Sequence, residues 1–201
     1  MIKGTTERVT GRREEIMNAC QRLYRMMSFR EITIKEIGAE LPFSRPTIYN
    51  YFETKEEIFL GLFEREYRLW TIDLGAIEPN TGALAEQIAQ TLEPRALMLR
   101  LLAVNLYDME ENSRIERLVE FKQAYRASVE TFDWLLQSAF PQWTEETRRE
   151  TLVAAFQFLH GVYPYAHATE KQIEAMEKAG VRYDQKSIYE LSLVGLSKIL
   201  R

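Results

Sequence analysis

Residues 33–58 read TIKEIGAELPFSRPTIYNYFETKEEI, and this stretch decides the fold. Thr33 and Glu36 have the spacing of a capping box, in which a hydroxyl and a carboxylate satisfy the free backbone amides at a helix start. Pro42 ends that helix, because proline lacks the amide that a helix interior requires. Ser44 is a suitable N-cap for a second short helix. The stretch therefore predicts two short helices separated by a tight break.

A longer amphipathic helix is predicted before this stretch, at about 10–27. Its apolar residues recur every three or four positions and so share one face: Ile16, Ala19, Cys20, Leu23, Tyr24 and Met27. Thr54 and Glu57 form a second capping box, so a further helix is expected to begin near residue 55. Two short helices held by a long one describe a helix-turn-helix unit.

The second short helix, at about 45–51, has two different sides. Ile48 and Phe52 are four residues apart and hold it to the core. The other side presents Arg45, Pro46, Thr47, Tyr49 and Asn50, with Tyr51 beside them. Arginine can pair with guanine, asparagine with adenine, and tyrosine hydroxyls reach phosphates. Helical periodicity alone leaves two interpretations open, a DNA-reading face and an ordinary solvated face.

These residues resemble the N-terminal domain of TetR-family transcriptional regulators. The family pattern has Thr at the start of the second helix, Ser before the third, Thr-aliphatic-Tyr within it, an aromatic residue and Phe at its end, and Lys-Glu opening the fourth. The matching residues are Thr33, Ser44, Thr47-Ile48-Tyr49, Tyr51-Phe52 and Lys55-Glu56. The resemblance covers about residues 10–60.

The resemblance implies a role for each matching residue. Phosphate contacts are expected from Thr33, Ser44, Tyr49, Tyr51 and Lys55. Base-edge contacts are expected from Arg45, Pro46, Thr47 and Asn50, with Lys35 near the groove.

Three positions depart from the family pattern. Ser28 and Pro42 stand where the family usually has Gly, and Gly38 stands where it usually has Ala. Proline cannot adopt the positive φ that glycine permits. The turn between the two short helices is therefore expected to differ in detail.

Charge is divided unevenly along the chain of 201 residues, whose net charge is −4. Residues 1–55 hold ten Lys or Arg against seven Asp or Glu, whereas the remaining residues hold 16 against 23. A basic end on an acidic body suggests that only the end meets a polyanion. The chain has one Cys, no apolar run of about 18 residues and no apolar N-terminal core. These features exclude a disulfide framework and predict no membrane span and no signal peptide, hence a cytoplasmic location.

Helical periodicity continues to the end of the chain, so the expected fold class is all-α. An N-terminal three-helix DNA-binding domain is expected over 1–55, and a helical bundle for ligand binding and dimerisation over 56–201. A loop is predicted over 75–82. Further helices are expected at about 83–92, 94–109, 113–139, 144–168, 170–179 and 185–200, the last capped by Asp184.

The resemblance implies a ligand pocket within the C-terminal body. The candidate wall residues are aromatic or histidine: Trp70, Tyr107, Phe121, Tyr125, Trp134, Phe156 and His160. Aromatic residues at helical spacing also suit a packed core. His160 and His167 lie near one helix face, but neither has a Cys or acidic partner near in sequence, so no metal site is predicted.

The last helix is apolar around most of its circumference. Its expected dimer contacts are Ile188, Leu191, Gly195, Leu196 and Ile199, which would pack with helix 144–168 into a four-helix interface. Burial of this helix inside a single chain is the alternative interpretation.

The favoured function is that of a homodimeric repressor that binds an inverted repeat in double-stranded operator DNA and is released by a small apolar or aromatic effector. An effector-independent DNA-organising protein on the same fold is one alternative, and a helical ligand carrier with a protein partner is another. No phosphate-binding loop, nucleophile elbow or metal-ligand pattern indicates an enzyme, and no cofactor is predicted.

Overall fold

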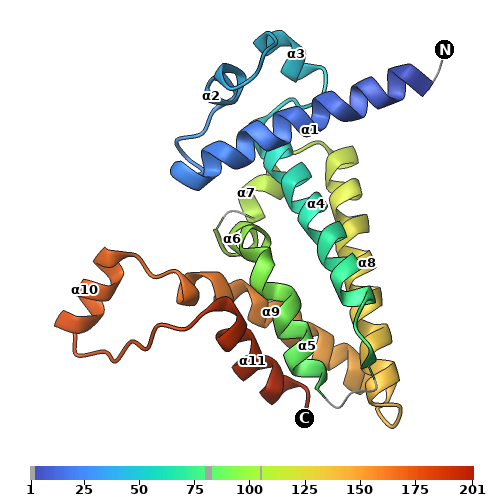
Figure 1. The fold of residues 1–201 in the computed structure, drawn as a ribbon, viewed down its shortest axis with the longest axis vertical. Helices are drawn as coiled ribbons and strands as arrows, with labels where there is room; N and C mark the ends of the chain where they lie inside the picture. Colours follow the sequence, from blue (N-terminus) through green and yellow to red (C-terminus); the bar gives the residue numbers. More distant parts are fainter. Residues whose placement is uncertain (1–2, 80–82, 105) are drawn as a thin grey trace. The chain divides into compact units, whose positions relative to one another are not determined.

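The computed structural model describes residues 3–79, 83–104 and 106–201 (Figure 1). In these ranges every regular element is a helix, which confirms the all-α fold class. In chain order the elements are α1 (Lys3–Met26), α2 (Ile34–Ala39), α3 (Arg45–Tyr49), α4 (Lys55–Gly75), α5 (Leu84–Leu92), the 3₁₀ turn η2 (Glu93–Arg95), α6 (Ala96–Val104), α7 (Leu106–Glu111), α8 (Ile115–Ala139), α9 (Glu145–Ala166), α10 (Glu170–Lys178) and α11 (Ile188–Ile199). None of the described helices has the length and apolar character needed to cross a bilayer.

Two of the predicted helices differ clearly from the observed ones. The first helix begins at Lys3 and not near residue 10. The helix expected at 94–109 is divided into η2, α6 and α7, with Pro94 in the 3₁₀ turn. Residues 80–82 of the predicted loop and Asn105 lie outside the described residues.

The predicted cap of the last helix was wrong. Ser187, and not Asp184, begins α11: its hydroxyl accepts from the amide of Glu190 (3.1 Å), and the Glu190 carboxylate accepts from the amide of Ser187 (2.8 Å). Asp184 instead pairs with Lys186 at 2.6 Å. A complete capping box satisfies two backbone amides, whereas Asp184 alone would satisfy one.

The chain forms two compact units. Unit 1 comprises Met1–Arg65 and Asn105–Gln123, and unit 2 comprises Glu66–Val104 and Ala124–Arg201. Both α4 and α8 therefore contribute residues to each unit. The division of labour between residues 1–55 and 56–201 stays a prediction.

The core of unit 1 joins α1 to the short helices and to α4. Cys20 and Tyr24 of α1 are buried, as are Ile37 of α2 and Ile48 of α3. The ring of Tyr24 meets that of Phe59 edge-on, with centroids 5.0 Å apart. Burial raises the pKa of the Cys20 thiol, so this residue is a neutral core side chain.

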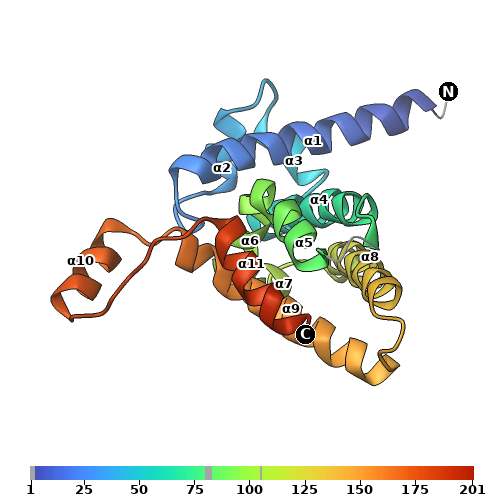
Figure 2. The ribbon, with the colours of Figure 1, turned by 60° about the horizontal axis from the view of Figure 1, so that its bottom comes forward.

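The core of unit 2 is built around α9, which packs against α6 and α11, while α11 also packs against α5 (Figures 1 and 2). An aromatic cluster fills it, made up of Tyr67, Trp70, Tyr125, Phe132 and Phe156. The Trp70 indole donates a hydrogen bond to the hydroxyl of Thr91 at 2.9 Å, so the buried N–H is satisfied.

Candidate functional site

Helix α3 has one buried anchor and a largely exposed polar side. Ile48 is fully buried, and Phe52 just beyond the helix is buried with it. The residues on the other side are Arg45, Pro46, Tyr49 and Asn50, all exposed, and Thr47, which is partly exposed. A helix of five residues is not stable alone, so its position depends on these two apolar anchors.

The start of α3 leaves a hydroxyl at the surface. Ser44 occupies the N-cap position with an extended backbone, and the amide of Thr47 donates to the Ser44 carbonyl at 2.9 Å. The Ser44 side chain makes no cap hydrogen bond and faces the Thr47 hydroxyl at 3.3 Å. Both hydroxyls lie at the tip of the helix, beside the exposed Arg45.

Helix α2 presents the other predicted contacts. Thr33 caps it by accepting from the amide of Glu36 at 3.4 Å, but the Glu36 carboxylate does not complete the predicted capping box. Both Thr33 and Lys35 are exposed. Helices α2 and α3 adjoin each other, so the DNA contacts predicted on the two helices lie on neighbouring elements.

The turn between α2 and α3 accommodates Pro42 without strain. Gly180 is the one residue with positive φ in the described parts of the chain, so this turn uses no left-handed residue. Phe43, which follows Pro42, is partly buried, and the Arg12 guanidinium of α1 lies 4.3 Å from its ring centroid. This contact, which the sequence did not suggest, fastens the turn to α1.

Gly38 allows Arg45 to lie close to α2. A Cβ atom at position 38 would lie 3.1 Å from Cγ of Arg45, which is closer than most packed side chains approach. The departure from the family pattern at Gly38 therefore has a structural reason, because the missing methyl group makes room for the arginine stem.

Lys55 is held more firmly than a surface residue. Its ammonium donates to the carbonyl of Phe29 at 2.7 Å and lies 4.4 Å from the centroid of the Phe29 ring. Lys55 therefore ties the start of α4 to the segment between α1 and α2. An ammonium has three protons, so a phosphate contact remains a prediction for this residue.

A buried ion pair, named here the Glu57 clasp, joins the start of α4 to the start of α8. The Glu57 side chain is 0% exposed, and its carboxylate accepts from Nε and Nη2 of Arg114 at 2.6 and 2.8 Å. It also accepts from the backbone amides of Glu53 (2.8 Å) and Arg114 (3.1 Å). Burial alone would raise the pKa of Glu57, but these hydrogen bonds outweigh it and hold that pKa below its ordinary value.

A second set of ion pairs fixes the end of the α3 segment. Arg117 donates to Glu120 at 2.7 Å and to the carbonyl of Tyr51 at 3.5 Å. Arg13 of α1 pairs with the same Glu120 at 3.0 Å and with Glu64 at 3.1 Å. Burial alone would raise the pKa of Glu120, but the hydrogen bonds and charges of Arg117 and Arg13 outweigh this effect. The pKa of Glu120 therefore lies below its ordinary value. Sequence reasoning missed the contacts of Arg13 and the contact of Arg117 with Tyr51, because these partners lie far apart along the chain, whereas Arg117 and Glu120 are only three residues apart.

Three of the seven candidate pocket residues meet at one hollow. Tyr125 of α8 and Phe156 and His160 of α9 line a surface hollow of about 320 Å³, together with Val129, Arg149, Leu152, Val153 and Gln157. Burial raises the pKa of the Tyr125 phenol, so its hydroxyl stays protonated at neutral pH and can donate a hydrogen bond.

The other four candidates lie elsewhere. Trp70 is fully buried in the aromatic cluster, and Phe121 is buried in unit 1 with its centroid 5.0 Å from that of Phe63. Tyr107 is 78% exposed and Trp134 is 48% exposed. His167 stacks on the ring of Tyr163 with centroids 4.3 Å apart.

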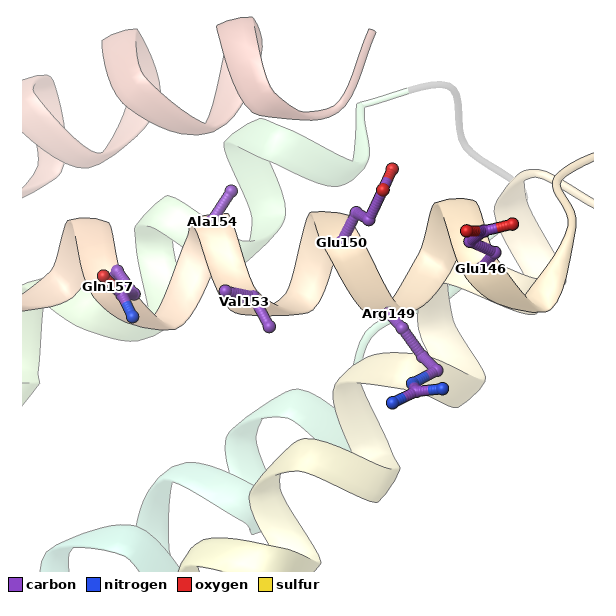
Figure 3. A pocket seen from close by; sticks show the side chains of 6 residues that line it. All are labelled: Glu146, Arg149, Glu150, Val153, Ala154 and Gln157. Carbon is purple, nitrogen blue, oxygen red and sulfur yellow. The ribbon is translucent and has the colours of Figure 1, made fainter.

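A second hollow lies on the outward face of α9 (Figure 3). It measures about 530 Å³ and is lined by Glu146, Arg149, Glu150, Val153, Ala154 and Gln157, of which Arg149, Val153 and Gln157 also line the first hollow. Val153 is 61% exposed, so this face combines charged side chains with an apolar centre.

Helix α11 divides its apolar residues between two sides. Ile188 and Leu196 are buried within the chain, whereas Leu191, Gly195 and Ile199 are partly exposed. A Cβ atom at position 195 would lie 2.3 Å from Cζ of Phe158 on α9, so this glycine permits close packing inside one chain. Val194, which is 57% exposed, was not among the predicted interface residues.

Comparisons with known proteins agree with this architecture. Residues 16–62 match the family described as "Bacterial regulatory proteins, tetR family", and residues 64–190 match "Tetracyclin repressor-like, C-terminal domain". No curated protein matches the sequence. Among solved structures, one described as a "Structural analysis of fatty acid degradation regulator FadR from Bacillus halodurans" is similar, with a TM-score of 0.62 and 14% identity over 94% of both chains. At this identity the likeness concerns the fold.

These matches cover the helix-turn-helix and most of the helical body. The resemblance inferred from residues 33–58 is thereby confirmed. TetR-family proteins are transcription factors and not enzymes. The chain belongs to the TetR family of DNA-binding transcriptional regulators.

Proposed function

We propose that this protein is a cytoplasmic homodimeric repressor that reads an inverted-repeat operator through α3 and releases it when a small apolar or aromatic effector binds to the body. The observation that carries the proposal is the exposed polar side of α3, held in place by the buried Ile48. Arg45 and Asn50 on that side have the donor geometry that reads guanine and adenine in a major groove.

Pairing of two chains follows from the way such helices read DNA. A twofold dimer places two recognition helices about one helical turn of DNA apart, and so reads two half-sites. The apolar residues left exposed on α9 and α11, including Val153 and Val194, support a dimer face there. The hollow shown in Figure 3 belongs to the same outward face of α9.

The hollow lined by Tyr125, Phe156 and His160 is the proposed effector site. Its walls combine the aromatic rings of Tyr125 and Phe156 and three aliphatic side chains with the polar side chains of Arg149, Gln157 and His160. A wall that is mainly apolar suits an aromatic or lipid-like molecule. The similar solved structure is described as a fatty acid degradation regulator, and a lipid-like effector is in keeping with that description. Release from DNA then follows from a preference of the effector for the DNA-free conformation.

The test of DNA reading begins with selection of bound sequences from random duplex DNA by the whole protein. An inverted repeat should emerge, and Arg45→Ala should relax the base preference at one position in each half-site. A bidentate base contact is worth roughly 1–3 kcal/mol of discrimination. Lys35→Ala is the control for the loss of a positive charge nearby. If the purified protein retains no duplex DNA at low salt, the proposal fails.

The effector part has its own test. A library of small molecules is titrated into the labelled operator complex, and release is read by fluorescence anisotropy. Tyr125→Ala should weaken the response while leaving operator affinity nearly unchanged, because Tyr125 belongs to unit 2 and the α3 surface to unit 1.

One observation favours the alternative of an effector-independent DNA organiser. Trp70 and Phe156, two of the side chains expected around a ligand, pack against each other and against Phe132 in the core, with centroids between 5.7 and 6.4 Å apart. Operator binding that no compound in the library alters, together with little sequence preference in the selection, would support this alternative.

A further inference from the structure

The segment between α9 and α11, residues 169–187, is named here the arm. It contains α10, which is closed at both ends by local hydrogen bonds. Thr169 and Gln172 form a complete capping box at its start. At its end Gly180 has a φ of 70°, and its amide donates to the carbonyl of Glu177 at 3.1 Å. The left-handed conformation favours glycine here, so the sequence specifies a discrete helix with a defined end.

Within the described parts of the chain, nothing buries this helix. None of the residues of α10 is buried, and its two large apolar side chains, Ile173 and Met176, are partly exposed. Val181, just after the helix, is 54% exposed. Figures 1 and 2 both show α10 projecting away from α9 and α11. A helix of nine residues is marginal in water, and one cap contributes only about 1 kcal/mol, so a covering surface is needed.

The charges of the arm indicate what kind of surface covers it. It carries four acidic and four basic side chains: Glu170, Glu174, Glu177, Asp184, Lys171, Lys178, Arg182 and Lys186. A nucleic acid or an anionic membrane would select an excess of positive charge, which the arm lacks. In a twofold contact the same surface is presented by both partners, and a neutral surface of mixed charges permits this without repulsion.

The position of the arm points to the same partner. It leaves the end of α9 and returns to the start of α11, the two helices on which Val153 and Val194 remain exposed. The arm is therefore continuous with the two helices on which the dimer interface is proposed above.

We infer that the arm packs its Ile173 and Met176 side onto a second copy of this chain, so that each protomer holds its partner through an exchanged helix. This inference rests on the proposed dimer. It adds an interaction surface outside the α9 and α11 face, and it accounts for how the apolar side of α10 becomes buried.

The first test uses the double variant Ile173→Ser, Met176→Ser in the whole protein. Analytical ultracentrifugation should show a dimer dissociation constant at least tenfold higher than that of the unchanged protein, with the helical circular dichroism retained. The matched control is Lys171→Gln, Ala175→Ser, because at 100° per residue these positions lie on the opposite side of α10. The control should leave the constant unchanged.

The second test needs no variant. Hydrogen exchange of residues 169–187, followed by mass spectrometry, should be slow above the dimer dissociation constant and fast after dilution below it. Exchange that does not depend on concentration would overturn the inference, as would an unchanged dissociation constant in the double variant. In either case dimerisation and selected DNA binding would persist, whereas failure of the proposed function would show as a monomer or as no selected sequence.

Discussion

Gly38 makes the close approach of Arg45 to α2 possible. Its replacement by alanine is expected to increase stability and, separately, to alter the base preference. Gly38→Ala should raise the free energy of unfolding by roughly 0.5–1 kcal/mol, because alanine is the better helix former and this position does not use a positive φ. The new methyl group would push the Arg45 stem by a few tenths of an ångström. Chemical denaturation should therefore show a more stable protein, while selection from random DNA should show an altered preference at the base that Arg45 reads.

The arginine stem is flexible and exposed, so it can move without disturbing the core. Unchanged base preference in Gly38→Ala would mean that the position of the Arg45 stem does not set the base preference. A loss of stability would mean that the methyl group meets more than this stem.

Gly195 gives a second prediction for a single residue. A methyl group there would overlap the Phe158 ring, so Gly195→Ala should lower the free energy of unfolding by about 2 kcal/mol, the usual cost of overpacking. Gly161→Ala in α9 is the control, because nothing lies within 4 Å of a Cβ built there, and it should be neutral or stabilising. The midpoint of thermal unfolding should fall for Gly195→Ala and should stay the same or rise for Gly161→Ala.

Individual residues were predictable where one local rule decides. Ile48 was expected inside and Arg45 and Asn50 outside, since helical spacing divides the faces of so short a helix. Lys55 was expected at the surface, but its ammonium binds the Phe29 carbonyl. That contact depends on where the α1–α2 segment passes, which no local pattern encodes.

The Glu57 clasp links the start of α4 to the start of α8, and replacing Arg114 tests how much this link stabilises the protein. Arg114→Met should lower the free energy of unfolding by roughly 2 kcal/mol at neutral pH, since a buried carboxylate would lose its partner. This is below the usual cost for a fully buried pair, because Arg114 is 39% exposed and water replaces part of the interaction. Arg126→Met, which breaks an exposed pair with Glu130, is the control and should leave stability nearly unchanged.

The same clasp predicts a pH dependence. The pKa of Glu57 is lower in the folded protein than its ordinary value near 4.5, so the unfolded chain binds the proton more readily. The stabilisation is therefore complete above that ordinary value and is lost as the pH falls through the lowered folded value. Denaturation measured from pH 7 to pH 3 should show the difference between the protein and Arg114→Met shrinking in acid. A difference that stays constant would contradict the pairing.

Caps and apolar spacing could predict where helices occur along the chain. They could not predict where a continuous apolar pattern is divided into separate helices. The α10 helix has the predicted end at Gly180, because a left-handed residue there is a local requirement. The helix expected at 94–109 instead became η2, α6 and α7, although its apolar pattern is continuous. For α11 the predicted cap was Asp184, but Ser187 begins the helix because Glu190 completes its capping box.

For the molecule as a whole, α11 allows a dimer interface to be distinguished from a chain's own core. Val194→Glu should dissociate the dimer with a penalty of about 3 kcal/mol, more than a hundredfold in the dissociation constant, because an unpaired charge would be buried between the chains. The separated chain should stay folded, since Val194 is 57% exposed. Light scattering and circular dichroism measure both effects.

Two further variants serve as comparisons for Val194→Glu. Leu196→Glu should unfold the chain, because Leu196 is 1% exposed. Val119→Glu, at a position of unit 1 that is 46% exposed, should leave the dimer intact. A dimer that survives Val194→Glu would place the interface on another surface. The sequence predicted that α11 is apolar. Which of its residues pack inside the chain and which remain for a partner could be distinguished only from the positions of α5 and α9 beside it.

Unit 1 is assembled from two separate stretches of chain, and this restricts how such a regulator can acquire a new specificity. A single crossover near residue 65, joining the front of one regulator to the rear of another, would separate Glu57 from Arg114 and Arg13 from Glu120. A working hybrid must carry residues 106–123 along with the front, so two exchanges are needed at once. Operator preference in this lineage is therefore expected to change through substitutions on α3, one side chain at a time, and not through transplantation of a ready-made reading head.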